Sequence, residues 1–126
     1  MNLLQMSSML FSTITIHAYY VNNHFYHHIS LLITIMSLLN HQDNPNSYIK
    51  IIDRIIAHYT YIQINISDSP IVLRKKPILL VNILLIPTIF ISELVFPLYA
   101  YTLHFILHLI SIGTFHSYLY YLENKN

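Results

Sequence analysis

The sequence predicts an all-α protein, a polytopic bundle of about five transmembrane helices. Of its 126 residues, 55% are hydrophobic and only 9% are charged, whereas a soluble domain carries about 25% charged residues. The apolar residues fall into five stretches, each of roughly the 17–25 residues that a helix needs to cross the hydrocarbon. A helix also satisfies its own backbone polar groups in lipid. We therefore expect an integral, multi-pass membrane protein.

The expected helices cover residues 3–21, 25–41, 48–66, 77–96 and 98–122. The first stretch contains no charge, follows no basic segment and precedes no small-residue cleavage site, so we expect a retained helix and not a signal peptide. The sequence "QDNPNS" at 42–47 predicts a short turn, because these residue types favour turns. The second and third helices should therefore be antiparallel neighbours.

The third helix is the most polar of the five, and "SDSP" followed by "RKK" predicts a short polar loop after it. Pro77 suits the first turn of the fourth helix, and Pro87 predicts a kink within that helix. The last helix follows Pro97. No internal repeat or second domain is evident, so we treat 1–126 as one domain.

The composition excludes several classes of function. The chain has no cysteine, which excludes disulfides and thiolate chemistry. Its net charge of +1, without a basic patch among exposed aromatic residues, gives no footprint for nucleic acid.

Four polar residues are expected at one face of the membrane. If the helices alternate in direction, the end of the second helix and the starts of the third and fifth lie at the same face. Ser37 and His41 are one turn apart at the end of the second helix. Asp53 and His104 each lie a few residues into their helices, so they should have similar depth.

This cluster predicts a zinc site. His104 and His108 are spaced to share one helix face, and His41 can supply a third nitrogen. Catalytic zinc takes three protein ligands and leaves a fourth position for water. Asp53 would then either hydrogen-bond to a zinc ligand or act as the base that holds the metal-bound water, and Ser37 would steady the site by hydrogen bonding.

The same residues resemble the membrane-hydrolase superfamily of alkaline ceramidases, adiponectin/progestin-type receptors and haemolysin III-like proteins. The resemblance rests on "SLLNH" (37–41), the aspartate in "IIDRIIAHYTYI" and the closing "HFILHLISIGTFHSYLYYL". It implies Zn²⁺ held by His41, His104 and His108, with Asp53 and Ser37 completing the site. The implied reaction is hydrolysis of a membrane lipid amide with release of a fatty acid.

The chain departs from that superfamily in three respects. It has room for about five helices, whereas the superfamily has seven. Asn40 stands where an aromatic residue usually precedes the histidine, and Arg54 stands where ceramidases have an acidic residue.

Simpler interpretations exist for each of these residues. His104 and His108 could serve only in helix packing, and Asp53 could pair with Lys50 or Arg54 on its own helix. The tyrosine-rich helix ends most simply form aromatic belts. The remaining histidines are expected at membrane interfaces; they are His17, His24, His27, His28, His58 and His116. Of these, His58 is the one that could instead join the cluster, because it lies five residues after Asp53.

Three functions from different classes follow. The protein is a zinc-dependent lipid amidase, or a non-catalytic receptor-like or regulatory protein that keeps the metal, or a small packing protein without metal. For orientation, basic residues near helix ends favour the cytoplasm. Four basic residues lie on the side of the C-terminus, namely Arg74, Lys75, Lys76 and Lys125, and two lie on the other side, Lys50 and Arg54. This difference predicts a cytoplasmic C-terminus.

Overall fold

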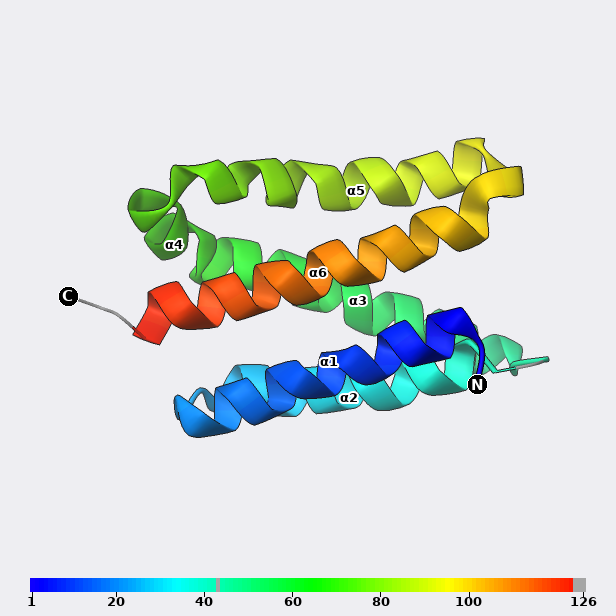
Figure 1. Ribbon diagram of the computed structural model, residues 1–126, viewed down its shortest axis with the longest axis horizontal. Coiled ribbons are helices and arrows are strands. Elements are labelled where there is room, and N and C mark those ends of the chain that lie inside the picture. The colour runs from blue at the N-terminus through cyan, green and yellow to red at the C-terminus, as the bar shows by residue number, and fades with distance from the viewer. Residues whose placement is uncertain (43, 124–126) are drawn as a thin grey trace.

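The computed structural model describes residues 1–42 and 44–123, and all the regular secondary structure within them is helical (Figure 1). Lys125 and Asp43, which entered the orientation count and the predicted turn, lie outside these described residues. The all-α prediction is confirmed for the described part of the chain. Its elements are α1 (Leu3–Tyr20), α2 (His24–Asn40), α3 (Ser47–Ser67), α4 (Ser69–Lys75), the 3₁₀ turn η1 (Pro77–Leu79), α5 (Leu80–Val95), the 3₁₀ turn η2 (Pro97–Tyr99) and α6 (Ala100–Glu123).

Asparagine marks the start of the first three helices. Asn2 forms a capping box with Gln5, and the side chains of Asn23 and Asn46 accept hydrogen bonds from the first turns of α2 and α3. An N-cap side chain of this kind satisfies a backbone N–H that the helix itself cannot pair. All five predicted stretches agree with the observed helices, counting each 3₁₀ turn with the helix after it, to within one residue at each end.

The predicted polar loop after the third helix is wrong, because residues 69–75 form the short helix α4. The backbone carbonyl of Asp68 accepts hydrogen bonds from Ile71 and Val72, which starts this helix. Val72 is completely buried in the hydrophobic core. The apolar residues between "SDSP" and "RKK" therefore anchor a turn of helix, although the polar residues around them are typical of a loop.

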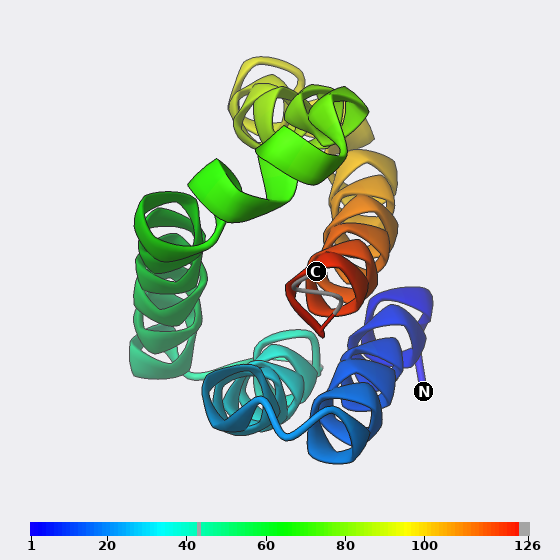
Figure 2. The same cartoon turned by 90° about the vertical axis from the view of Figure 1, so that its left-hand side faces the viewer.

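The five long helices form a ring in the order α1, α2, α3, α5, α6, and α6 returns to pack against α1 (Figure 2). The short helix α4 bridges from α3 towards α5 and also contacts α6. The start of α1 meets the end of α2 through a hydrogen bond from Asn2 to the His41 carbonyl, and the start of α6 through Tyr101. Successive long helices therefore alternate in direction, as predicted.

Pro87 lies inside α5 and leaves one backbone carbonyl of that helix without its usual hydrogen-bond donor. A proline has no N–H, so the carbonyl four residues earlier, that of Ile83, loses its usual helical partner. The hydroxyl of Tyr61 on α3 donates a hydrogen bond of 2.7 Å to this carbonyl. The proline therefore links α5 to α3.

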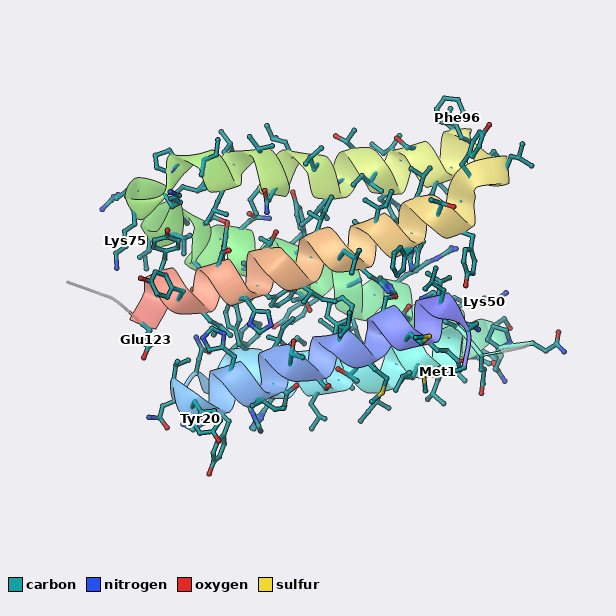
Figure 3. All side chains as sticks on the ribbon, in the orientation of Figure 1. Met1, Tyr20, Lys50, Lys75, Phe96 and Glu123 are labelled. Carbon is teal, nitrogen blue, oxygen red and sulfur yellow. The ribbon has the colours of Figure 1, made fainter. Side chains whose placement is uncertain are left out.

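Among the described residues, two helical segments are long and apolar enough to cross a membrane by length and composition, namely Pro77–Val95 and Pro97–Glu123. This result agrees with the prediction of a helical protein that has segments able to span a bilayer. A crossing by all five segments stays a prediction. Figure 3 marks the two ends of the bundle, with Met1, Lys50 and Phe96 at one end and Tyr20, Lys75 and Glu123 at the other.

Replacing Tyr61 by phenylalanine should destabilise the protein by about 1–3 kcal/mol, because the Ile83 carbonyl is left without a partner. Tyr59→Phe is the matched control, since Tyr59 lies on the same helix and is exposed. Unfolding of both variants in detergent, followed by helical circular dichroism, measures the difference. Equal stability of the two variants would contradict the role given to Tyr61.

Candidate metal centre

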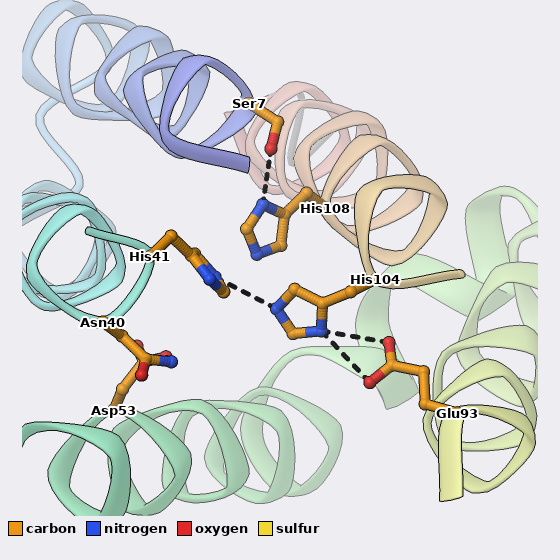
Figure 4. Close-up of polar contacts among 7 residues, drawn as sticks. All are labelled: Ser7, Asn40, His41, Asp53, Glu93, His104 and His108. Atoms are coloured by element: carbon orange, nitrogen blue, oxygen red, sulfur yellow. Dashed lines mark hydrogen bonds and ion pairs between the residues drawn. The ribbon is translucent and has the colours of Figure 1, made fainter. Parts of the chain in front are cut away.

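Three histidines meet at the end of the bundle where α2 stops and α6 begins (Figure 4). His41 directly follows the last residue of α2, and His104 and His108 lie one turn apart near the start of α6. Each offers one ring nitrogen, and these atoms all lie within 4.8 Å of one another. The structure thus brings together the three histidines that the sequence singled out.

A serine of α1 fixes the orientation of His108. The Ser7 hydroxyl donates its one hydrogen to the Leu4 carbonyl, at 2.9 Å, and its oxygen lies 2.7 Å from Nδ1 of His108. The serine oxygen can then only accept, so Nδ1 of His108 carries a hydrogen and donates it. The neutral ring therefore keeps its lone pair on Nε2, which points into the cluster in Figure 4.

A carboxylate of α5 orients His104 in the same way. Nδ1 of His104 lies 3.0 and 3.2 Å from the two oxygens of Glu93, so this nitrogen donates to the carboxylate. The neutral ring again has its lone pair on Nε2. Metal-binding histidines commonly donate their second ring N–H to a carboxylate or another oxygen, which fixes the ring and raises its basicity.

The third ring, His41, faces His104 directly. The Nε2 atoms of the two residues are 3.2 Å apart. Because Nε2 of neutral His104 has the lone pair, Nε2 of His41 donates the hydrogen in the metal-free arrangement. The backbone carbonyl of His41 is also held by Asn2, at 2.6 Å. If the ring hydrogen of His41 moves to its Nδ1, the ring stays neutral and all three Nε2 atoms can turn to one centre.

Asp53 and Ser37 line the same cavity as the histidines, but their hydrogen bonds go elsewhere. Asp53 accepts a hydrogen bond of 2.8 Å from the side chain of Asn40, and not from Lys50 or Arg54. Ser37 bonds to Ser8 of α1, at 2.6 Å. The catalytic roles assigned to Asp53 and Ser37 remain predictions.

Ser7, Glu93 and Asn40 were not assigned to the site from the sequence. Glu93 is one of only two glutamates and stands in an apolar stretch, and an ionisable residue within such a segment is itself a signal of function. Ser7 carries no comparable signal, because serine is common in this chain. Asn40 differs from the aromatic residue that the resemblance predicts at this position, and its side chain instead donates a hydrogen bond to Asp53.

The histidines lie at one end of a partly open cavity of about 670 Å³ between the helices. The opposite end is also polar, because Tyr26 donates to Asp68 at 2.9 Å and Tyr118 bonds to Ser69 at 2.7 Å. Between these ends the wall is largely apolar, and its residues include Ile33, Ile64, Ile86, Phe90 and Leu107. The cavity is suited to a long apolar group with a polar end at the histidines.

Comparisons with protein-family models, with curated proteins and with solved structures gave no significant match. The interpretation of the site therefore rests on its own geometry and on the sequence motifs.

Removing the carboxylate of Glu93 should weaken the binding of zinc by about 10–100-fold, because His104 loses the partner that orients it. The variant is Glu93→Ala, measured by competition with a chelating dye in detergent. Glu93→Gln should recover much of the affinity, since its amide oxygen can still accept from Nδ1. Glu123→Ala is the control at the exposed end of α6. Equal affinity of Glu93→Ala and the unchanged protein would overturn this prediction.

Proposed function

We propose that this protein is a zinc-dependent integral membrane hydrolase that acts on lipid amides. The observation that carries the proposal is the convergence of three imidazoles at one of the two polar ends of a largely apolar cavity. A lipid amide has a polar carbonyl near a long hydrocarbon chain, which matches that arrangement of polar and apolar walls.

The donor set fits zinc. Zn²⁺ binds imidazole nitrogen at about 2.0–2.1 Å, and a catalytic site combines three protein ligands with one open position. Here three neutral imidazoles supply the nitrogens, and His104 and His108 already have Nδ1 committed to Glu93 and Ser7. When bound, zinc supplies Lewis-acid chemistry, in that it polarises a carbonyl oxygen and makes water more acidic.

Asp53 is the residue we assign to proton transfer. Asn40 donates to one oxygen of its carboxylate, Oδ2, so the other oxygen can take a proton from the attacking water and pass it to the leaving amine. A positioned acid or base of this kind contributes about 10²–10⁴-fold to a rate. Ser37, held by Ser8, lies on the same cavity wall and serves to position the polar end of the substrate.

The outward surfaces of the bundle support insertion of all five long helices into lipid. Large apolar side chains are exposed on every long helix, while many polar side chains face inward or bond to their own helix. Exposed apolar surface on this scale marks contact with lipid or with another protein. Exposed examples are Ile16, Leu32, Ile55, Leu84, Leu94 and Leu109.

A second function has one observation in its favour. The hydrogen bond between Asn40 and Asp53 draws the carboxylate towards α2, and no hydrogen bond joins Asp53 to the histidines among the described residues. In this alternative the metal is a structural clasp between α2 and α6, and the protein is a non-catalytic receptor-like or regulatory membrane protein.

Asp53→Asn should lower the release of fatty acid from ceramide-like substrates by about 100-fold or more, while the zinc content stays unchanged. The carboxylate is lost but the three nitrogen ligands remain. Asp68→Asn is the control, because Asp68 bonds to Tyr26 at the other end of the cavity.

The outcomes of this assay separate the three functions. Release of fatty acid that survives Asp53→Asn contradicts the role of Asp53. A zinc-bound protein that releases no fatty acid supports the clasp. A zinc content near zero that His104→Ala does not change excludes both metal-based functions.

Four basic residues, three of them near the end of α4 and one in the C-terminal tail, outnumber the two on the other side; we therefore predict a cytoplasmic C-terminus and histidines near the non-cytoplasmic face. A glycosylation tag fused after Asn126 should therefore stay unmodified. The same tag inserted in the turn at 42–47 should be modified. The reverse pattern of modification would invert the orientation.

A further inference from the structure

A second pair of histidines lies away from the three described above. The rings of His17 on α1 and His116 on α6 are nearly parallel, with an angle of 17° between their planes and 5.1 Å between their centroids. Their Nδ1 atoms are 2.9 Å apart. Both side chains are half-buried. Along α6, His116 is eight residues beyond His108, which corresponds to about 12 Å.

The hydrogen bonds around the pair fix the tautomer of His116. The Thr13 hydroxyl donates its hydrogen to the Leu10 carbonyl, at 2.6 Å, so its oxygen can only accept. That oxygen lies 2.8 Å from Nε2 of His116, which must therefore carry the ring hydrogen. The neutral ring then has its lone pair on Nδ1, facing His17. This is the arrangement of a metal ligand with its second nitrogen anchored by an oxygen.

The distance between the two Nδ1 atoms fits one particular coordination geometry. Two bonds of about 2.0–2.1 Å at a right angle separate their nitrogens by about 2.9 Å, whereas a tetrahedral angle requires about 3.3 Å. The observed 2.9 Å is the length of the hydrogen bond between the two rings, and the nitrogens could keep this separation in neighbouring positions of a square-planar or tetragonal ion once the rings turn. Cu²⁺ prefers this geometry and binds imidazole more tightly than the other divalent first-row ions.

We propose that His17 and His116 form a second metal site that binds a divalent ion of Cu²⁺ type through their Nδ1 atoms. The ion lies off the line between the two nitrogens, so both rings turn towards it. The hydrogen on Nδ1 of His17 moves to its Nε2, so the ring stays neutral and no proton need be released. Water completes the coordination on the half-exposed side. This site does not depend on the proposed hydrolase function, because it shares no ligand with the first centre.

The test is a titration of the full-length protein in detergent with Cu²⁺ alone. The starting variant is His104→Gln, which disables the first centre. It should bind one equivalent of Cu²⁺, with an electron paramagnetic resonance spectrum showing coupling to two imidazole nitrogens. Adding His116→Gln should weaken this binding by at least about 100-fold and remove the two-nitrogen coupling.

Two further variants control for folding and for unspecific binding. Thr13→Val keeps both histidines and should weaken Cu²⁺ binding by about 10-fold, because Nε2 of His116 loses its anchor. His28→Gln removes an exposed histidine of α2 and should leave the affinity unchanged. If neither His116→Gln nor Thr13→Val alters the affinity or the spectrum, the pair is only a hydrogen bond and the proposal is wrong. Equal losses with His28→Gln would also overturn it.

Discussion

The candidate metal centre depends on where the Nδ1 hydrogens of His104 and His108 go. A free imidazole can present either ring nitrogen, and the hydrogen bond made by one nitrogen decides that the other keeps the lone pair that a metal ion needs. Glu93 takes the hydrogen of one ring and Ser7 takes that of the other. Ser7 can do so only because its own hydrogen is given to a backbone carbonyl of its helix. In an apolar setting, a hydroxyl bonded in this way changes from a donor into a pure acceptor, and Thr13 does the same for His116.

The helices form a ring and not a close-packed bundle, so even a short chain leaves a cavity at its centre. Five long helices surround the space, and α4 covers the corner between α3 and α5 where these two helices have few contacts. The odd number of long helices keeps the start of α6 at the same end as the end of α2. For this reason the polar residues of helices far apart in the sequence meet at one end of the cavity.

Most of the helical architecture could be predicted from the sequence, because the apolar stretches are long and are separated by asparagine, proline and charged residues. The meeting of His41 with His104 and His108 also followed from alternating helix directions. The short helix α4 could not be predicted, since its polar neighbours are typical of a loop and its anchor, Val72, is buried only by tertiary packing. Ser7 and the Asn40–Asp53 bond were missed for a related reason. Their roles depend on the facing side chain of another helix, which spacing along one helix does not reveal.

The hydrogen bond between Tyr61 and the Ile83 carbonyl makes two positions on different helices chemically interdependent. With proline at 87, a phenylalanine at 61 would leave a bare carbonyl inside the bundle. With leucine at 87, the helix would pair that carbonyl itself, and the hydroxyl at 61 would have no backbone partner there. The residues at positions 61 and 87 are therefore coupled through this one carbonyl, so the effect of changing either residue depends on which residue stands at the other position.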